Sequence, residues 1–292
     1  MTALLGPIAV VACLASGVGI SRLVGRLRRG EPLVPALPAN PVPWDGLDVA
    51  ALFVLFMACQ VGVGVLVSLV TPTTAGATPV VTNAGLAASA VAMLVFTLLG
   101  MVVLRLRGAP AGSLGFRDPQ PAAGLRLAVG TWVIIVPPLL AVAAFLDRFV
   151  VSYSHPVVDF LRADRSLPAV GLVVLTAVVA APIAEEFFFR RVLQGWLETR
   201  LGEQAIVVSA VCFGLAHLGH GLGWIPLIGF GLATGYLARR RGTILPGIVV
   251  HALFNAVSVA LLLLPPPSTP GGRLNDVDEK TDLVKVSANS TP

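Results

Sequence analysis

Eight apolar runs, each near the length needed to cross a bilayer, take up most of this 292-residue chain. They cover approximately residues 3–20, 47–70, 85–104, 125–146, 168–189, 205–218, 224–238 and 243–264. A spanning helix takes about 20 residues. Because 56% of the residues are hydrophobic and only 12% are charged, one aqueous core could not bury the apolar side chains. We therefore expect an all-α fold, a polytopic transmembrane helix bundle with about eight spanning helices.

The charges of the short loops between these runs alternate along the chain. Every second loop is basic, and the four basic loops contain Arg22, Arg26, Arg28, Arg29, Arg105, Arg107, Arg117, Arg190, Arg191, Arg200, Arg239, Arg240 and Arg241. Basic loops face the cytoplasm, so we expect a multi-pass cell-membrane protein with its N-terminus and its C-terminal tail outside. The sixth and seventh runs are short for a full span. Six spans with a re-entrant pair are therefore the alternative, although the charges favour eight.

Composition divides the chain into three parts and limits its partners. Residues 1–123 contain N-terminal spans and a proline-rich linker, residues 124–264 contain the remaining spans, and residues 265–292 have the composition of a disordered tail. The net charge of +5 comes mainly from arginines clustered beside apolar runs, and aromatic residues make up only 7%. We expect contact with membrane lipid and no binding of nucleic acid.

Two adjacent carboxylates, Glu185 and Glu186, follow an uninterrupted apolar run and precede three phenylalanines. Ionisable groups at membrane depth are costly and often functional. On a helix Glu186 and Arg190 share a face in the favourable order of acid before base, so we expect them to pair. Glu185 lies about 100 degrees around the helix, which leaves it available for another role. A salt-bridge cluster at the end of a span, with no catalytic role, is the alternative.

Two later apolar runs contain His217 and His251, and Asn255 shares a helix face with His251. Each histidine alone is typical of a satisfied structural residue, and an asparagine often joins neighbouring membrane helices. Three helices that each bring an imidazole or a carboxylate into one bundle could together hold a water molecule against a carbonyl group. The chain contains no H-E-x-x-H or G-x-S-x-G motif, so those zinc and serine chemistries are not expected.

The motifs E-E-x-x-x-R (Glu185 to Arg190), F-x-x-x-H (Phe213 to His217) and H-x-x-x-N (His251 to Asn255), in this order, resemble those of the CPBP family of intramembrane proteases. That family includes the type II CAAX prenyl endopeptidases and proteins related to bacteriocin immunity. The resemblance covers about residues 168–264, and the Leu114-Gly115-Phe116 turn resembles an element that often precedes the family's core. It implies that residues 124–264 form a catalytic helix bundle.

The resemblance also implies a role for each motif residue in an intramembrane endopeptidase that cleaves a peptide or membrane-protein substrate. Glu185 would be the base that activates water, assisted by His217. His251 and Asn255 would stabilise the oxyanion, while Glu186 and Arg190 would support Glu185. We expect no cofactor, because an asparagine beside His251 suits an oxyanion hole. The alternative is zinc on Glu185, His217 and His251.

Two other classes of protein remain possible on the sequence. A non-catalytic scaffold or immunity-type protein would have the same fold, and the intact motifs argue against a degenerate copy of an enzyme. In a proton-coupled transporter, Glu185 and the histidines would form a proton relay. Such transporters often have broken helices in matched halves, and we find no such repeat.

Overall fold

The computed structural model describes residues 2–37, 42–70, 81–151, 156–219 and 221–264, and these residues contain helices but no strand. The predicted all-α fold is therefore confirmed. The predicted tail at 265–292 lies outside the described residues. The partition at residue 123 stays a prediction, and helix α4 (Pro121–Phe149) crosses it.

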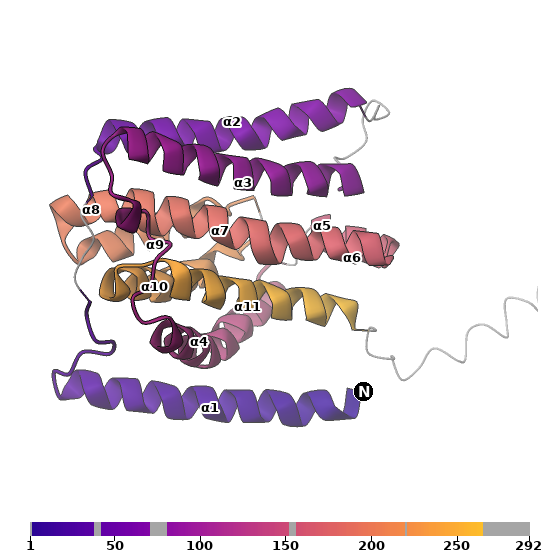
Figure 1. The fold of residues 1–292 in the computed structure, drawn as a ribbon. Helices are drawn as coiled ribbons and strands as arrows, with labels where there is room; N and C mark the ends of the chain where they lie inside the picture. Colours follow the sequence, from indigo (N-terminus) through magenta and orange to yellow (C-terminus); the bar gives the residue numbers. More distant parts are fainter. Residues whose placement is uncertain (1, 38–41, 71–80, 152–155, 220, 265–292) are drawn as a thin grey trace, which may run out of the picture.

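Six helical segments of the described chain are long and apolar enough to cross a membrane. Figure 1 shows most of them running side by side in one bundle, with α4 inclined to the others and the N-terminal helix along one edge. They are α1 (Thr2–Arg28), α2 (Gly46–Val70), α3 (Asn83–Leu106), α4, the helical segment Leu167–Leu201 and α11 (Leu245–Leu263). A short helix, α5 (Pro156–Ala163), precedes the fifth of these segments.

The count of six differs from the predicted eight at the two short apolar runs. These runs form α9 (Gln204–Leu215) and α10 (Trp224–Arg241), which pack against each other. At 1.5 Å per residue, the 12 residues of α9 reach roughly 18 Å, well short of the hydrocarbon thickness of about 30 Å. Three arginines in the last turn of α10 lower its hydropathy. The described helices thus favour the alternative of six spans with a re-entrant pair.

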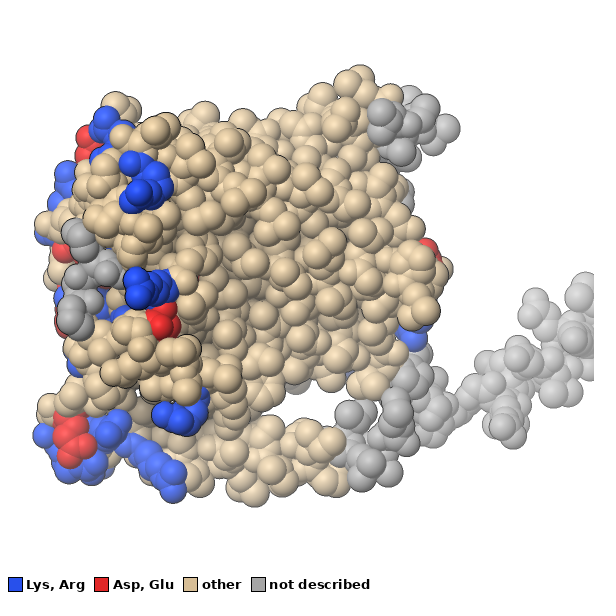
Figure 2. All heavy atoms as spheres, viewed as in Figure 1, with Lys and Arg blue, Asp and Glu red and all other residues tan. Residues whose placement is uncertain are grey.

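Basic side chains gather at one end of the bundle (Figure 2). This is the end at which α1, α3 and α10 finish (Figure 1), each with arginine in its last turn. The opposite end contains few charged residues, among them the exposed pair Asp159 and Arg162 of α5. Arginines expected in basic loops therefore gather at one end of the fold. The prediction is wrong for Arg190 and Arg191, which are buried inside the helical segment Leu167–Leu201, where they contact other side chains and backbone rather than solvent.

The fifth spanning segment contains two π-helical stretches. It comprises α6 (Leu167–Val173), a π-helical stretch Val174–Ala180, α7 (Ala181–Glu185), a second π-helical stretch Glu186–Leu193 and α8 (Gln194–Leu201). Pro182 lacks the N–H of a regular helix and its ring crowds the preceding turn. The wider stretch just before Pro182 accommodates both defects. π-helical turns are frequent at functional sites, and here the second begins at Glu186.

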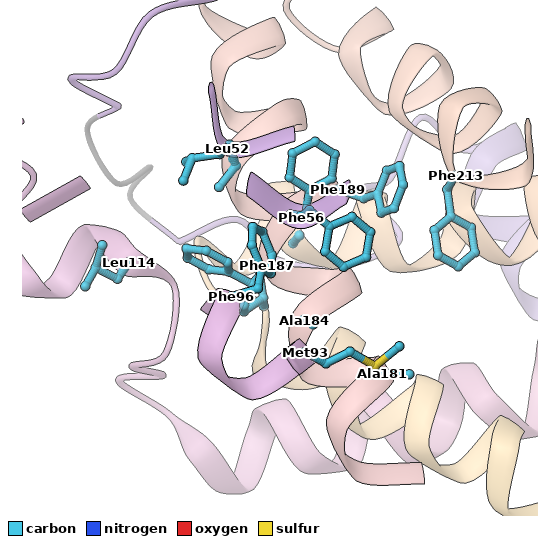
Figure 3. Close-up of a cluster of buried hydrophobic side chains, with 14 of the residues drawn as sticks. Leu52, Phe56, Met93, Phe96, Leu114, Ala181, Ala184, Phe187, Phe189 and Phe213 are labelled. Atoms are coloured by element: carbon cyan, nitrogen blue, oxygen red, sulfur yellow. The ribbon is translucent and has the colours of Figure 1, made fainter. Parts of the chain in front are cut away.

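Aromatic side chains pack around this segment and fix its rotation (Figure 3). Phe187 and Phe188 are buried against Phe96 of α3, with ring centroids 6.1 and 6.3 Å apart, and Phe96 packs at 4.8 Å on Phe56 of α2. On the other side Phe189 meets Phe213 of α9 at 5.2 Å. Burying a large apolar side chain contributes about 1.5–3 kcal/mol. The three consecutive phenylalanines therefore bury rings on two sides of the helix and leave the neighbouring glutamates facing inward.

The Leu114-Gly115-Phe116 turn connects three parts of the fold. The carbonyl oxygen of Gly115 accepts hydrogen bonds from the backbone N–H of Ile244 (2.9 Å) and from the Thr243 hydroxyl (2.7 Å), just before α11 begins. Arg191 donates from Nε to the carbonyl oxygen of Ser113. Gly115 has φ +86°, a conformation that glycine adopts at little cost. The turn thereby joins α11 to the segment that contains both glutamates.

Candidate functional site

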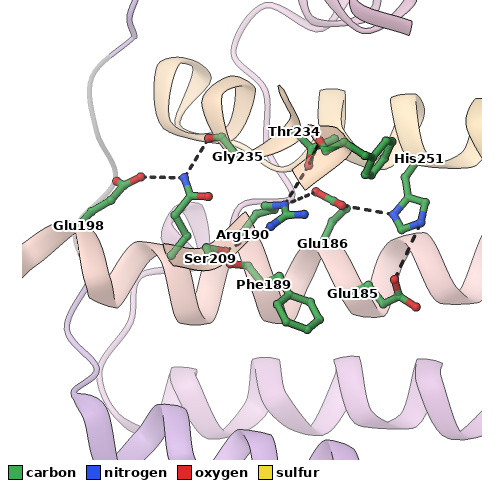
Figure 4. Close-up of polar contacts among 11 residues, drawn as sticks. Glu185, Glu186, Phe189, Arg190, Glu198, Ser209, Thr234, Gly235 and His251 are labelled. Carbon is green, nitrogen blue, oxygen red and sulfur yellow. Dashed lines mark hydrogen bonds and ion pairs between the residues drawn. The ribbon is translucent and has the colours of Figure 1, made fainter. Parts of the chain in front are cut away.

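Glu186 lies at the centre of a buried polar cluster (Figure 4). Its Oε2 accepts a hydrogen bond from Nε of Arg190 at 3.2 Å, and both side chains are fully buried. Its Oε1 lies 3.2 Å from Nδ1 of His251 on α11. The ion pair predicted from the spacing of Glu186 and Arg190 is therefore present. Glu186 also contacts His251, which the helical spacing did not predict.

Arg190 connects the segment to two further helices through residues that the sequence did not single out. Its Nε is 2.9 Å from the Thr234 hydroxyl of α10, and its Nη1 donates to the Ser209 hydroxyl of α9 at 3.2 Å. The guanidinium also lies over the ring of Phe213, 4.7 Å from its centroid. Ser209 and Thr234 are isolated hydroxyls in apolar helices. Their only signal in the sequence is their polarity at membrane depth.

Glu185 points away from this ion pair and toward two imidazole rings. Its Oε2 is 4.0 Å from Nε2 of His217 and 3.9 Å from Nε2 of His251. The side chain of Glu185 is 14% exposed, and Oε2 is buried without a hydrogen bond among the residues that the structure describes. A buried acceptor without a donor is costly. The structure thus brings Glu185, His217 and His251 together around a small polar space.

The contacts of the two imidazole rings fix which nitrogen faces that space. Nδ1 of His217 lies 2.8 Å from the carbonyl oxygen of Phe213, which can only accept, so Nδ1 bears the hydrogen. Nδ1 of His251 faces the Glu186 carboxylate, which also favours a hydrogen on Nδ1. In the neutral rings, both Nε2 atoms then present lone pairs toward Glu185. Three acceptors therefore converge, and a molecule that donates hydrogens would fit among them.

Asn255, one turn after His251, uses one of its amide hydrogens in a hydrogen bond within the fold. Its Nδ2 donates to the carbonyl oxygen of Ala177 at 2.7 Å, in the first π-helical stretch. In a π-helical turn the backbone carbonyls have different hydrogen-bond partners from those of an α-helix. The side-chain amide of Asn255 supplies a donor to one of these carbonyls, that of Ala177. An asparagine amide group has two N–H donors, so a second donor remains for a substrate. Asn255 also holds α11 against the segment that contains Glu185.

A glycine lets α11 approach the polar cluster closely. A Cβ atom at Gly247 would lie 2.8 Å from Oε2 of Glu186 and 3.6 Å from Cβ of Thr234. A Cβ atom at Gly231 of α10 would likewise lie 3.0 Å from Cα of Ala210 in α9. Small residues at helix contacts let backbones come together. Here they bring His251 and Thr234 within reach of Glu186 and Arg190.

The geometry also bears on the zinc alternative. Ligands around a tetrahedral zinc ion, with bonds of about 2.0–2.1 Å, lie roughly 3.4 Å apart. Oε2 of Glu185 is farther than that from both Nε2 atoms. Within the described ranges, no group of three or more His, Cys, Asp or Glu side chains is spaced to hold a metal ion. The three side chains as placed would therefore have to move closer together to bind zinc.

Comparison with known proteins gives one match. Residues 167–257 match the family described as type II CAAX prenyl endopeptidase, Rce1-like. No curated protein and no solved structure matches the chain. The matched residues begin at α6 and end in α11, so they include all six candidate site residues. The match confirms the resemblance drawn from the three motifs. The match covers 91 of the 292 residues, and its description is that of a family of prenyl endopeptidases.

Proposed function

We propose that this protein is an intramembrane endopeptidase in which Glu185 activates a water molecule to cleave a membrane-associated substrate. One observation carries the proposal: Oε2 of Glu185 is buried without a hydrogen-bond donor in the described structure and faces Nε2 of both His217 and His251. The separations of 3.9 and 4.0 Å are too long for direct hydrogen bonds. A bound water molecule could donate to Oε2 and to one Nε2.

The reaction follows from this placement of the water. Glu185 takes one proton as the water oxygen attacks the carbonyl carbon of the peptide bond. The other O–H stays on the attacking oxygen and donates a hydrogen bond to Nε2 of His217, which keeps that oxygen oriented. When the C–N bond breaks, the proton held by Glu185 passes to the leaving amine nitrogen. A positioned general base of this kind contributes typically 10²–10⁴-fold to the rate.

The oxyanion would be stabilised by His251 and Asn255. His251 can donate from Nε2 only when both ring nitrogens hold a proton. In that form Nδ1 would donate to the Glu186 carboxylate, 3.2 Å away, and Nε2 would donate to the oxyanion. The second amide hydrogen of Asn255 is the other donor. Glu186 and Arg190 are positioning residues, because they hold the His251 ring and fix the helix turn that follows Glu185.

The test compares the native chain with Glu185→Gln, purified in detergent, on peptides tethered to a membrane anchor, with and without a lipid-modified cysteine near the C-terminus. Glutamine keeps the size of the side chain but cannot take up the proton. We expect cleavage to fall by 10²-fold or more while the melting temperature stays close to that of the native protein. The matched control is Glu203→Gln, because Glu203 is 76% exposed outside the site.

Two further measurements separate the alternatives. A strong chelator in a parallel reaction tests zinc: unchanged cleavage supports the metal-free mechanism, whereas lost cleavage that zinc restores supports a metal on Glu185, His217 and His251. Equal cleavage by the native protein and by Glu185→Gln would contradict the proposed role of Glu185. If a folded native protein cleaves no peptide of the set, the non-catalytic scaffold gains support. Proton uptake in vesicles that depends on Glu185 would support the transporter.

A further inference from the structure

An apolar cavity lies outside the candidate site, between α1, α4 and α10. Its volume is about 440 Å³, within the range of roughly 300–1,000 Å³ typical of ligand pockets. Apolar side chains form most of its walls, including Leu23 of α1, Ile134 of α4 and Leu232 of α10. It lies on a different face of α10 from the one that contacts Arg190, because Thr234 faces Arg190 whereas Leu232 and Ala233 line the cavity.

This apolar cavity continues into a more polar one at the basic end of the bundle. The adjoining cavity, about 390 Å³, is lined by Arg126, Leu127, Gln120 and Arg241, among others, and the first two residues line both cavities. Arg241 is paired with Asp118 at 2.9 Å. Arg126 makes no ion pair or hydrogen bond with the part of the chain that the structure describes. The unpaired guanidinium of Arg126 therefore lies where the apolar cavity meets the more polar one. The apolar cavity is called the groove from here on.

The contact between α1 and the rest of the bundle leaves this groove open. The Ser16 hydroxyl donates to the carbonyl oxygen of Ile134 at 2.6 Å, and Gly19 lies against the same residue. Nearer the basic end, the carbonyl oxygen of Val34 accepts from Nε of Arg240 at 2.8 Å. The groove occupies the space between these two attachments. In Figure 2 the surface is also open between the first helix and the bundle toward the opposite end.

We propose that this groove binds one anionic phospholipid, with an acyl chain between α1, α4 and α10 and the headgroup phosphate on Arg126. The charge of Arg126 selects the occupant: a phosphate oxygen suits the planar donors of a guanidinium, and an apolar groove with a cationic mouth complements an anionic lipid. Anionic headgroups lie at this depth if the basic end faces the cytoplasm. The inference does not depend on the proposed protease activity.

Native mass spectrometry of the full-length protein purified in detergent tests this inference, with phosphatidylglycerol and phosphatidylcholine of equal chain length added in turn. We expect one phosphatidylglycerol per chain, retained in preference to phosphatidylcholine. In Arg126→Gln this preference should fall about five-fold, the factor that corresponds to about 1 kcal/mol per basic residue. The matched control is Arg28→Gln. Arg28 is exposed at the same end of the bundle but does not line either cavity.

A second pair of variants tests the apolar groove itself. Gly130 lines it and has open space where a side chain would begin, so Gly130→Leu should fill the groove without strain and abolish retention of both lipids. Gly171 on α6 has equally open space but lies elsewhere, so Gly171→Leu should bind lipid like the native chain. Equal retention of the two lipids by the native protein would overturn the proposal. Unchanged lipid binding in Arg126→Gln or in Gly130→Leu would also overturn it. The same holds if the groove binds an isoprenoid-modified peptide and neither phospholipid.

Discussion

Two carboxylates that are neighbours in the sequence have different surroundings in this fold. Glu186 is fully buried and is held by Arg190 and His251, whereas Glu185 faces a polar space between Nε2 of His217 and Nε2 of His251. The division follows from the 100-degree rotation between adjacent helix positions. One glutamate supports the site, and the other is the residue to which we assign the chemistry.

At the same scale, the buried ion pair gives a prediction about stability. Arg190→Met removes one partner and leaves the Glu186 carboxylate buried without its guanidinium. We expect this substitution to lower the free energy of unfolding in detergent by about 3–5 kcal/mol. The comparison is Arg162→Met, which removes one partner of an exposed pair on α5 (Arg162 and Asp159, 67% and 60% exposed) and should cost less than about 1 kcal/mol. Similar losses in the two variants would contradict the interpretation of a buried charge cluster.

The sequence predicted part of this arrangement because some contacts are local. The pairing of Glu186 with Arg190 follows from one helix spacing, and the three motifs identified His217, His251 and Asn255. Ser209 and Thr234 were missed because they approach Arg190 from other helices, 19 and 44 residues away. The sequence contains no repeating pattern that identifies an isolated hydroxyl as the partner of a side chain on another helix. The contact of Asn255 with Ala177 was equally unpredictable, since it depends on the wider turn around that carbonyl.

Among the elements, the turn before α4 connects α11 with the segment that contains the two glutamates. The Gly115 carbonyl binds the start of α11, and Ser113 binds Arg191. A Cβ atom on Gly115 would face an unfavourable backbone conformation at φ +86° and would lie 3.2 Å from Cδ of Arg191. This residue therefore has both a conformational and a steric reason to be glycine.

Gly115→Ala should therefore destabilise the protein by about 1–3 kcal/mol, the usual cost of a strained left-handed residue. Because the turn joins α11 to the segment that contains the glutamates, peptide cleavage should also decrease. Gly112→Ala is the internal control, since Gly112 lies in the 3-10 helix Ala111–Leu114 that leads into the turn, has no positive φ and has open space around it. A thermal melt of the two variants in detergent measures the difference. A loss in Gly112→Ala as large as that in Gly115→Ala would argue against this explanation.

For the whole molecule, hydropathy predicted the helices well and the number of spans less well. Apolar content identifies every helix of spanning length, but α9 and α10 show why the count is harder. A helix too short to cross alone can still be apolar throughout when it packs inside a bundle. The charges of the loops could not decide between six and eight spans, because a re-entrant pair returns the chain to the same side of the membrane as two full spans do.

Accessibility labelling distinguishes six spans from eight. In a background with Cys13, Cys59 and Cys212 replaced, single cysteines at Asn83, Gly219 and Glu203 would be treated with a membrane-impermeant maleimide on intact cells. We expect outside labelling at Asn83, labelling at Glu203 only after permeabilisation, and no outside labelling at Gly219, which lies in the turn between α9 and α10. Labelling of Gly219 from outside would support eight spans. Reversed labelling of Asn83 and Glu203 would invert the proposed orientation.

The position of Glu185 along its segment has a consequence for the timing of the proposed reaction. Glu185 is 18 residues from Leu167 and 16 from Leu201, so it lies roughly 24–27 Å from either end of a regular helix of this length. A transmembrane substrate helix that reached Glu185 would first have to unwind, because its peptide carbonyls are occupied by helical hydrogen bonds. The rate of turnover would then depend on how easily the substrate unwinds as well as on its side chains. Glycine or proline near the cleaved bond would speed the reaction even without touching the enzyme.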